Sequence, residues 1–173
     1  SVTLGLASAA LSRGIPTLVV DMDPQADAST GLDVPVTTPA DIADVLAAPK
    51  SKLVKQAITP SGWVEGKHGV LDVIPGSPRA AEFDRPSLSD RYLKRLREAI
   101  TRNGSKYRLV LIDCPPSLNG LTRAAWTASQ RVLIVTEPGL FSVAAADRAL
   151  RATDELRRRS AAKLQPLGCL LYT

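Results

Sequence analysis

Apolar and polar residues alternate with two different periods along the chain, and these periods predict strands that alternate with helices. Short apolar runs that end at acids, Gly or Pro predict strands over residues 18–21, 70–74, 107–113, 132–136 and 167–173. Apolar residues at helical spacing predict helices over residues 2–12, 39–47, 53–58, 90–102, 121–129 and 142–159. This order favours an α/β fold, a mostly parallel sheet flanked by helices, in a single domain over residues 1–173.

Two of the predicted strands end in aspartate. Residues 18–25 are Leu-Val-Val-Asp-Met-Asp-Pro-Gln, which places Asp21 and Asp23 at the end of one strand. Residues 109–117 are Leu-Val-Leu-Ile-Asp-Cys-Pro-Pro-Ser, which places Asp113 at the end of another. Ligands of open α/β sheets bind outside the carboxyl ends of the strands, so the two strand ends predict one shared site.

Clustered carboxylates at strand ends have two uses that sequence alone does not separate. They bind a hard cation, usually through water, or they position a nucleophilic water. A strand-end aspartate also commonly caps the helix or turn that follows it. The combination of both segments favours a ligand site, and Pro115 and Pro116 predict a rigid extended loop that would sense the ligand.

Composition narrows the class of protein. Aromatic residues make up 4% of the chain, so the core is expected to consist of Leu, Val, Ile and Ala, as in parallel sheets covered on both faces. No apolar run approaches the roughly 20 residues that a membrane span requires, which excludes integral membrane contact. Cys114 and Cys169 lack Cys-x-x-Cys spacing and are expected to be reduced thiols of a cytoplasmic protein.

The residues around the strand-end acids resemble a known family. Residues 20–32, Val-Asp-Met-Asp-Pro-Gln-Ala-Asp-Ala-Ser-Thr-Gly-Leu, resemble the segment that follows the first helix in the ParA/MinD family of deviant Walker-type P-loop ATPases. Residues 111–117, Leu-Ile-Asp-Cys-Pro-Pro-Ser, are similar to the Walker B motif and second switch of that family. The resemblance covers essentially the whole chain, including Ile-Pro-Gly-Ser at residues 74–77.

The resemblance implies a role for each candidate site residue. Asp23 matches the position that orients water for attack on the γ-phosphate of ATP, and Asp113 matches the acid that holds Mg²⁺ through a water ligand. Asp21 matches an acid near the magnesium shell. The remaining matched residues belong to the two loops expected to report the nucleotide state: Pro24, Gln25, Pro115, Pro116 and Ser117.

One family motif has no match. The P-loop, Lys-Gly-Gly-x-Gly-Lys-Thr, lies immediately before the position of Ser1 in the family, together with a central first strand. The segment at residues 62–68 has the wrong spacing for a Walker A motif and lacks its Ser/Thr. We therefore expect these residues to belong to a longer protein that extends before Ser1 and after Thr173, and expect the 173 residues alone to hydrolyse no ATP.

Basic residues gather in the predicted helix 142–159. The resemblance implies that an ATP-bound dimer binds DNA without sequence preference. The candidate residues for contacts to DNA phosphates are Arg148, Arg151, Arg158 and Arg159. Asp154 and Glu155 precede Arg158 and Arg159 at i,i+4 spacing, so an ordinary solvated helix face explains the same pattern. Both interpretations remain open from sequence.

The function implied by the resemblance is an ATP-dependent switch for chromosome or plasmid partitioning. Its expected partners are nonspecific DNA, a ParB-like centromere-binding protein and a second copy of the chain, with a cytoplasmic, nucleoid-associated location. Alternatives are a MinD-like ATPase that positions the division site, or a non-catalytic ParA-like interaction module without a P-loop. A phosphoacceptor receiver domain fits poorly, because Glu137-Pro138 stands where such a domain has Lys-Pro.

Overall fold

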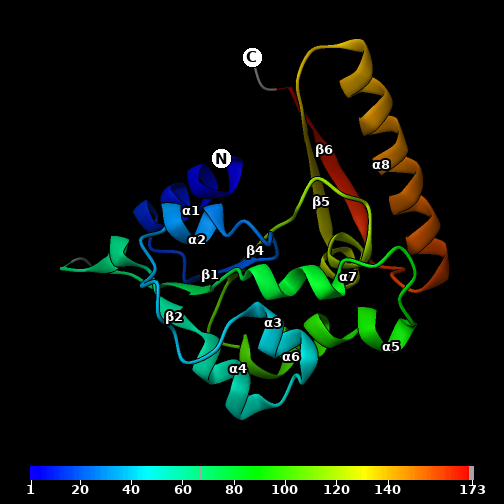
Figure 1. The fold of residues 1–173 in the computed structure, drawn as a ribbon. Coiled ribbons are helices and arrows are strands. Elements are labelled where there is room, and N and C mark those ends of the chain that lie inside the picture. Colours follow the sequence, from blue (N-terminus) through cyan, green and yellow to red (C-terminus); the bar gives the residue numbers. More distant parts are fainter. Residues whose placement is uncertain (67, 172–173) are drawn as a thin grey trace.

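The computed structural model describes residues 1–66 and 68–171 and contains two sheets (Figure 1). The larger sheet has the strand order β2-β3-β1-β4. Its strands are β1 (Thr17–Asp21), β2 (Thr59–Pro60), β3 (Leu71–Ile74) and β4 (Leu109–Asp113). Strand β1 is parallel to both β3 and β4, and β2 is antiparallel to β3. The smaller sheet pairs β5 (Arg131–Thr136) with β6 (Gln165–Leu171) in parallel. These pairings confirm the predicted α/β fold with a mostly parallel sheet.

Helices cover both faces of the larger sheet (Figure 1). On one face lie α1 (Val2–Ser12) and α2 (Asp27–Gly31); on the other lie α3 (Ile42–Ala47), α4 (Ser51–Ala57) and α6 (Arg95–Asn103). Alternate side chains of β1 serve the two faces, because successive residues of a strand point in opposite directions. Leu18 and Val20 belong to the larger core cluster, whereas Val19 belongs to the smaller cluster with Ala7 of α1. The apolar run of β1 is therefore buried on both sides.

The smaller sheet packs on α8 (Leu140–Arg159). Along the chain, α7 (Gly120–Ala128) connects β4 of the larger sheet to β5 of the smaller one. Val132 and Ile134 of β5 join the larger core, but Val135, Leu167 and Leu170 are exposed. Within residues 1–66 and 68–171, no hydrogen-bonded ladder joins β4 to β5. Strands β4 and β5 therefore each keep one unpaired edge.

The structure corrects the boundaries of two predicted helices. The helix predicted over residues 39–47 begins at Ile42, because the Asp41 side chain accepts hydrogen bonds from the Ala43 and Asp44 N–H groups and caps it. The helix predicted over residues 90–102 divides at Lys94 into α5 (Asp90–Leu93) and α6. Here Arg95 donates hydrogen bonds to the carbonyls of Leu46 and Ala47, which ties the start of α6 to the end of α3.

Most other elements appear within a few residues of their predicted positions. Helix α1 ends as expected, and Gly14 follows it with a φ of 64°, in the left-handed region that favours glycine. Four elements of the described residues were not predicted: α2, β2 and two 3₁₀ helices, η1 (Gly62–Val64) and η2 (Pro78–Phe83). Lys67 of the rejected Walker A segment lies outside the described residues, as do Tyr172 and Thr173 of the last predicted strand.

Candidate nucleotide site

The carboxyl ends of β1 and β4 lie side by side, as the sequence predicted. Asp21 and Asp113 are direct partners in the register of the two parallel strands. The Met22 N–H continues the pairing by donating to the Asp113 carbonyl at 2.8 Å. Because β1 and β4 are adjacent, the turn that contains Asp23 and the loop that begins at Cys114 start from the same edge of the sheet.

Asp21 is completely buried, and hydrogen bonds within the protein engage both of its carboxylate oxygens. Oδ2 accepts the Ser29 N–H at 2.8 Å and the Ser29 hydroxyl at 2.7 Å, and Oδ1 accepts the Asp23 N–H at 3.1 Å. Burial raises the pKa of Asp21, with a further contribution from the charge of Asp113, although the bonds from Ser29 and Asp23 oppose the shift. This environment favours a residue that shapes the first loop over one that binds metal.

Asp113 is half-buried, and its carboxylate accepts fewer hydrogen bonds than that of Asp21. Its Oδ1 accepts a hydrogen bond from the Thr3 hydroxyl of α1, and Oδ2 has no hydrogen-bond partner in the described part of the chain. Burial raises the pKa of Asp113, and the negative charges of Asp23 and Asp27 raise it further. A carboxylate with an open oxygen, crowded by other negative charges, is suited to a divalent cation.

The described residues do not by themselves form a closed metal cage. Among residues 1–66 and 68–171, no group of three or more His, Cys, Asp or Glu side chains is arranged to hold a metal ion. Magnesium is usually held by only one or two carboxylates, several waters and the phosphates of a substrate. The donor set at Asp113 therefore fits Mg²⁺ bound together with a phosphate ligand, but not a cation bound by protein alone.

The turn after Asp23 is held against the segment that follows β3. The Asp23 carboxylate accepts the Gln25 N–H at 2.9 Å, and Ala26 takes a φ of 57°. Gly76 packs so closely that a Cβ there would lie 2.9 Å from both the Asp21 Cγ and the Asp23 carbonyl oxygen. Only glycine fits this position. Pro24 is half-buried and Gln25 is exposed, so the Gln25 side chain can meet a partner.

The loop after Asp113 is held by hydroxyl groups. Ser117 donates to Asp84 at 2.8 Å, and Thr122 of α7 donates to the Ser117 carbonyl at 2.6 Å. Pro115 is buried and Pro116 is exposed. The loop that was predicted to sense a ligand is therefore anchored on the side of α7.

Cys114 directly follows Asp113, and its thiol is unreactive at neutral pH. Burial, together with the charges of Asp113, Asp23 and Asp21, raises the pKa of its thiol to about 12. A thiol with so high a pKa is a poor nucleophile at neutral pH. Cys114 and Cys169 are both free, which agrees with their prediction as reduced thiols.

The sequence did not predict a role in the site for four residues: Thr3, Ser29, Gly76 and Asp84. Helix 2–12 contains three hydroxyl residues, Thr3, Ser8 and Ser12, and no local pattern distinguishes Thr3 from the other two. The contacts of Ser29 and Gly76 depend on how the chain folds back over β1. Asp84 lies in a connection, with no local pattern that indicates its contact with Ser117.

The predicted basic residues of α8 are all exposed, as a DNA-contacting or a solvated face requires. These are Arg148, Arg151, Arg158 and Arg159. The expected i,i+4 ion pairs of Asp154 and Glu155 do not occur in the described residues. Asp154 instead pairs with Arg157 at 3.1 Å, at i,i+3 spacing, and Arg151 pairs with Asp147 at 2.8 Å.

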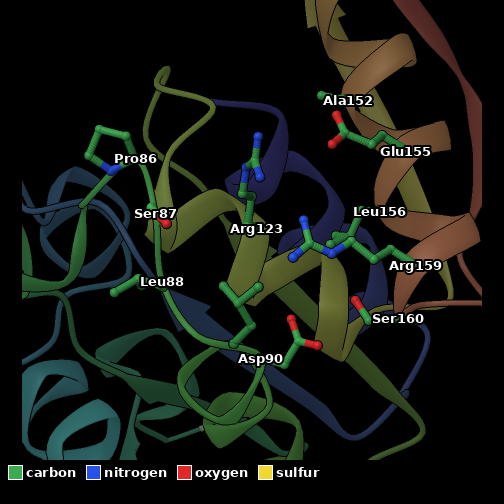
Figure 2. A pocket seen from close by; sticks show the side chains of 11 residues that line it. Pro86, Ser87, Leu88, Asp90, Arg123, Ala152, Glu155, Leu156, Arg159 and Ser160 are labelled. Atoms are coloured by element: carbon green, nitrogen blue, oxygen red, sulfur yellow. The ribbon is translucent and has the colours of Figure 1, made fainter.

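A cavity of about 70 Å³ lies between the start of α5, α7 and the end of α8. Figure 2 shows Arg123 of α7 and Arg159 of α8 on its walls, with Asp90 and Glu155 nearby. Arg159 is the only predicted site residue on its walls in the described chain, and none of the three strand-end aspartates lines it. The candidate site is therefore defined by the strand ends and not by this cavity. Among the described helices, none is long and apolar enough to cross a membrane.

An edge where parallel strands deliver acids beside two loops, in a sheet covered by helices, is the arrangement of P-loop nucleotide hydrolases. A family model described as an AAA domain matches residues 1–166. The chain belongs to this family and, through its relatives, to the ParA/MinD group of P-loop ATPases.

Two curated relatives support this assignment. The chromosome partitioning protein ParA of Caulobacter vibrioides is 31% identical, over 99% of this chain and 62% of that protein. The sporulation initiation inhibitor protein Soj of Bacillus subtilis is 33% identical, over 99% of this chain and 65% of that protein. The chain therefore spans less than two thirds of the length of either relative.

A solved structure supports the fold. Cobyrinic acid a,c-diamide synthase from Mycobacterium smegmatis, with bound ADP and magnesium, superposes with a TM-score of 0.82 at 22% identity. The match covers 98% of this chain and 66% of that one. At this identity the likeness concerns the fold alone.

Proposed function

We propose that the full-length protein is an ATP-dependent switch for chromosome or plasmid partitioning. The observation that carries the proposal is the β1–β4 register, in which Asp113, with an open carboxylate oxygen, adjoins the turn of Asp23. The names of the ParA and Soj relatives support the partitioning role. A switch needs a nucleotide site between loops that can change position, and both loops begin at this edge.

In this proposal each acid has its own task. Asp23 orients the attacking water, and Asp113 holds Mg²⁺ through a water ligand. Magnesium, when bound, neutralises charge that develops on the phosphates. Asp21 keeps the first loop folded through its hydrogen bonds with Ser29. Gln25 and Ser117 belong to the two loops whose conformation reports the nucleotide state to a partner. Phosphoryl transfer requires mainly positioning and charge neutralisation, so this small set of residues is sufficient on the protein side, together with a phosphate-binding loop.

The test is ATP turnover by the full-length protein with Mg²⁺, with and without DNA. Asp23→Ala is expected to lower kcat about 100-fold, because the loss of a group that positions the reacting water removes a few kcal/mol of transition-state stabilisation. Glu98→Gln removes an exposed acid of α6 and serves as the matched control, with turnover within about twofold of wild type. Equal turnover by wild type and Asp23→Ala would exclude Asp23 from this role. Absence of turnover by wild type under both conditions would refute the ATPase proposal.

We also propose that the ATP-bound dimer binds DNA through α8 and that a ParB-like partner stimulates hydrolysis. The supporting observation is that Arg148 and Arg158 are exposed and have no ion-pair partner in the described part of the chain. Replacing both with Ala should reduce the slope of log K against log salt by about 0.9 for each lost phosphate contact. The matched control is the loss of Arg91 and Arg97, which are exposed on α5 and α6. An equal reduction in both variants would refute a specific role for α8.

A further inference from the structure

The connection after β3 contacts both loops of the candidate site. At its start, the Gly76 N–H donates to the Ser29 hydroxyl at 2.9 Å, and that hydroxyl in turn donates to Asp21. At its end, Asp84 accepts a hydrogen bond from the Ser117 hydroxyl at 2.8 Å. Residues 76–84 therefore form a continuous link between the loop after β1 and the loop after β4.

Asp84 holds two points of the second loop at once. Besides Ser117, its carboxylate accepts the Leu121 N–H at 3.2 Å, in the first turn of α7. The residue that precedes α7, Asn119, provides no capping hydrogen bond from its side chain. Asp84 thus supplies from a distant segment the acceptor that the helix lacks locally, and its negative charge suits a helix N-terminus.

Backbone packing reinforces this contact. A Cβ on Gly120 would collide with the Phe83 carbonyl oxygen, and it would lie 2.5 Å from the Leu88 side chain and 3.0 Å from the Arg85 carbonyl oxygen. The start of α7 and the segment of residues 83–85 therefore meet backbone to backbone, with the Leu88 side chain packed beside them. A movement of the loop after Asp113 must be transmitted to the segment that contains Asp84.

We propose that Asp84 is a positioning residue that holds the loop of residues 114–119 in its working position beside Asp113 and couples it to the loop after β1. The inference rests on the proposed ATPase function, since the position of this loop matters only if the site binds nucleotide. Asp84 acts through Ser117 and the start of α7 and does not touch the reacting groups.

The experiment compares Asp84→Ala, Ser117→Ala and the double variant in the full-length protein. Asp84→Ala should lower kcat about tenfold and leave KM for ATP within about twofold, because the loop is displaced while the phosphates are still bound. The double variant should be no worse than Asp84→Ala alone, since both changes break the same contact. Asp84→Asn keeps an acceptor and should recover most of the lost kcat. Glu82→Ala, an exposed acid of η2, is the control and should match wild type.

Amide hydrogen exchange provides a readout that does not require activity. Exchange at residues 117–121 should become about tenfold faster in Asp84→Ala and stay unchanged in Glu82→Ala. The inference is overturned if exchange is unchanged in Asp84→Ala, if its kcat equals that of wild type, or if the two single losses multiply in the double variant. If wild type shows no turnover, the proposed function fails, and the exchange result separately decides whether Asp84 holds the loop.

Discussion

Strands β1 and β4 look alike in sequence but end in acids with different surroundings. Each is an apolar run that closes with aspartate, and the two aspartates face each other in register. Asp21 is completely buried with three hydrogen bonds, whereas Asp113 is half-buried and accepts one, from Thr3. An apolar run that ends in aspartate therefore predicts where a carboxylate lies, and the donors around it decide what the carboxylate can do.

The difference follows from the residues after each strand. Asp21 accepts a hydrogen bond from the N–H of Asp23, two positions later. The equivalent position after Asp113 is Pro115, which has no N–H to donate, and Pro116 has none either. The loop after β4 therefore cannot satisfy its own aspartate in the way the loop after β1 does. The proline pair leaves Asp113 open for a ligand.

Asp21→Ala tests the first half of this comparison and should have the largest effect. It leaves the buried N–H and hydroxyl of Ser29 and the N–H of Asp23 without their acceptor, so we expect the free energy of unfolding to fall by about 3 kcal/mol. Urea denaturation measures the change. Asp21→Asn keeps one acceptor oxygen and should lose only about 1 kcal/mol. A loss below about 0.5 kcal/mol for Asp21→Ala would contradict the structural role.

The sequence predicted the parts of the fold that depend on local pattern. Strand β3 and helix α1 follow from an apolar run and from helical spacing with Gly14 at the end. Helix α2 has five residues, too few to be stable without tertiary contacts, and it depends on the bonds between Ser29 and Asp21. Such an element cannot be predicted until the packing is known.

The same limit applied to the site. The positions of Asp21, Asp23 and Asp113 followed from strand ends, and the structure brings these ends together. The contrast between Asp21 and Asp113 depended on Ser29 and Thr3, which come from α2 and α1. Asp84 reaches Ser117 across 33 positions of sequence. Pro115 was identified from the sequence. Its effect on Asp113, the absence of an N–H donor, became evident only from comparison with the Asp23 N–H that Asp21 accepts.

Asp113→Asn tests the second half of the comparison through pH. The raised pKa of folded Asp113 means that the folded state holds this proton more tightly than the unfolded chain. Its contribution to stability is therefore present below the unfolded pKa of about 3.9 and is lost as the pH rises through the folded pKa. The variant should be more stable than wild type at neutral pH, and this advantage should disappear in acid. Denaturant curves at several pH values measure it; a variant less stable than wild type at neutral pH would show that Asp113 is structural.

Pro115→Ala should have the smallest effect and would make the second loop more like the first. It places an N–H two residues after Asp113, where Asp23 provides one to Asp21. If this N–H donates to the carboxylate, the charged form is stabilised and the pKa of Asp113 falls. The substitution should also cost about 0.5–1 kcal/mol of stability, because the unfolded chain gains freedom when proline is lost. Carbon NMR of the Asp113 carboxylate follows the titration, with Pro116→Ala as the control for proline loss alone. An unchanged Asp113 pKa in Pro115→Ala would mean that burial and neighbouring charge, and not the missing donor, set Asp113 apart from Asp21.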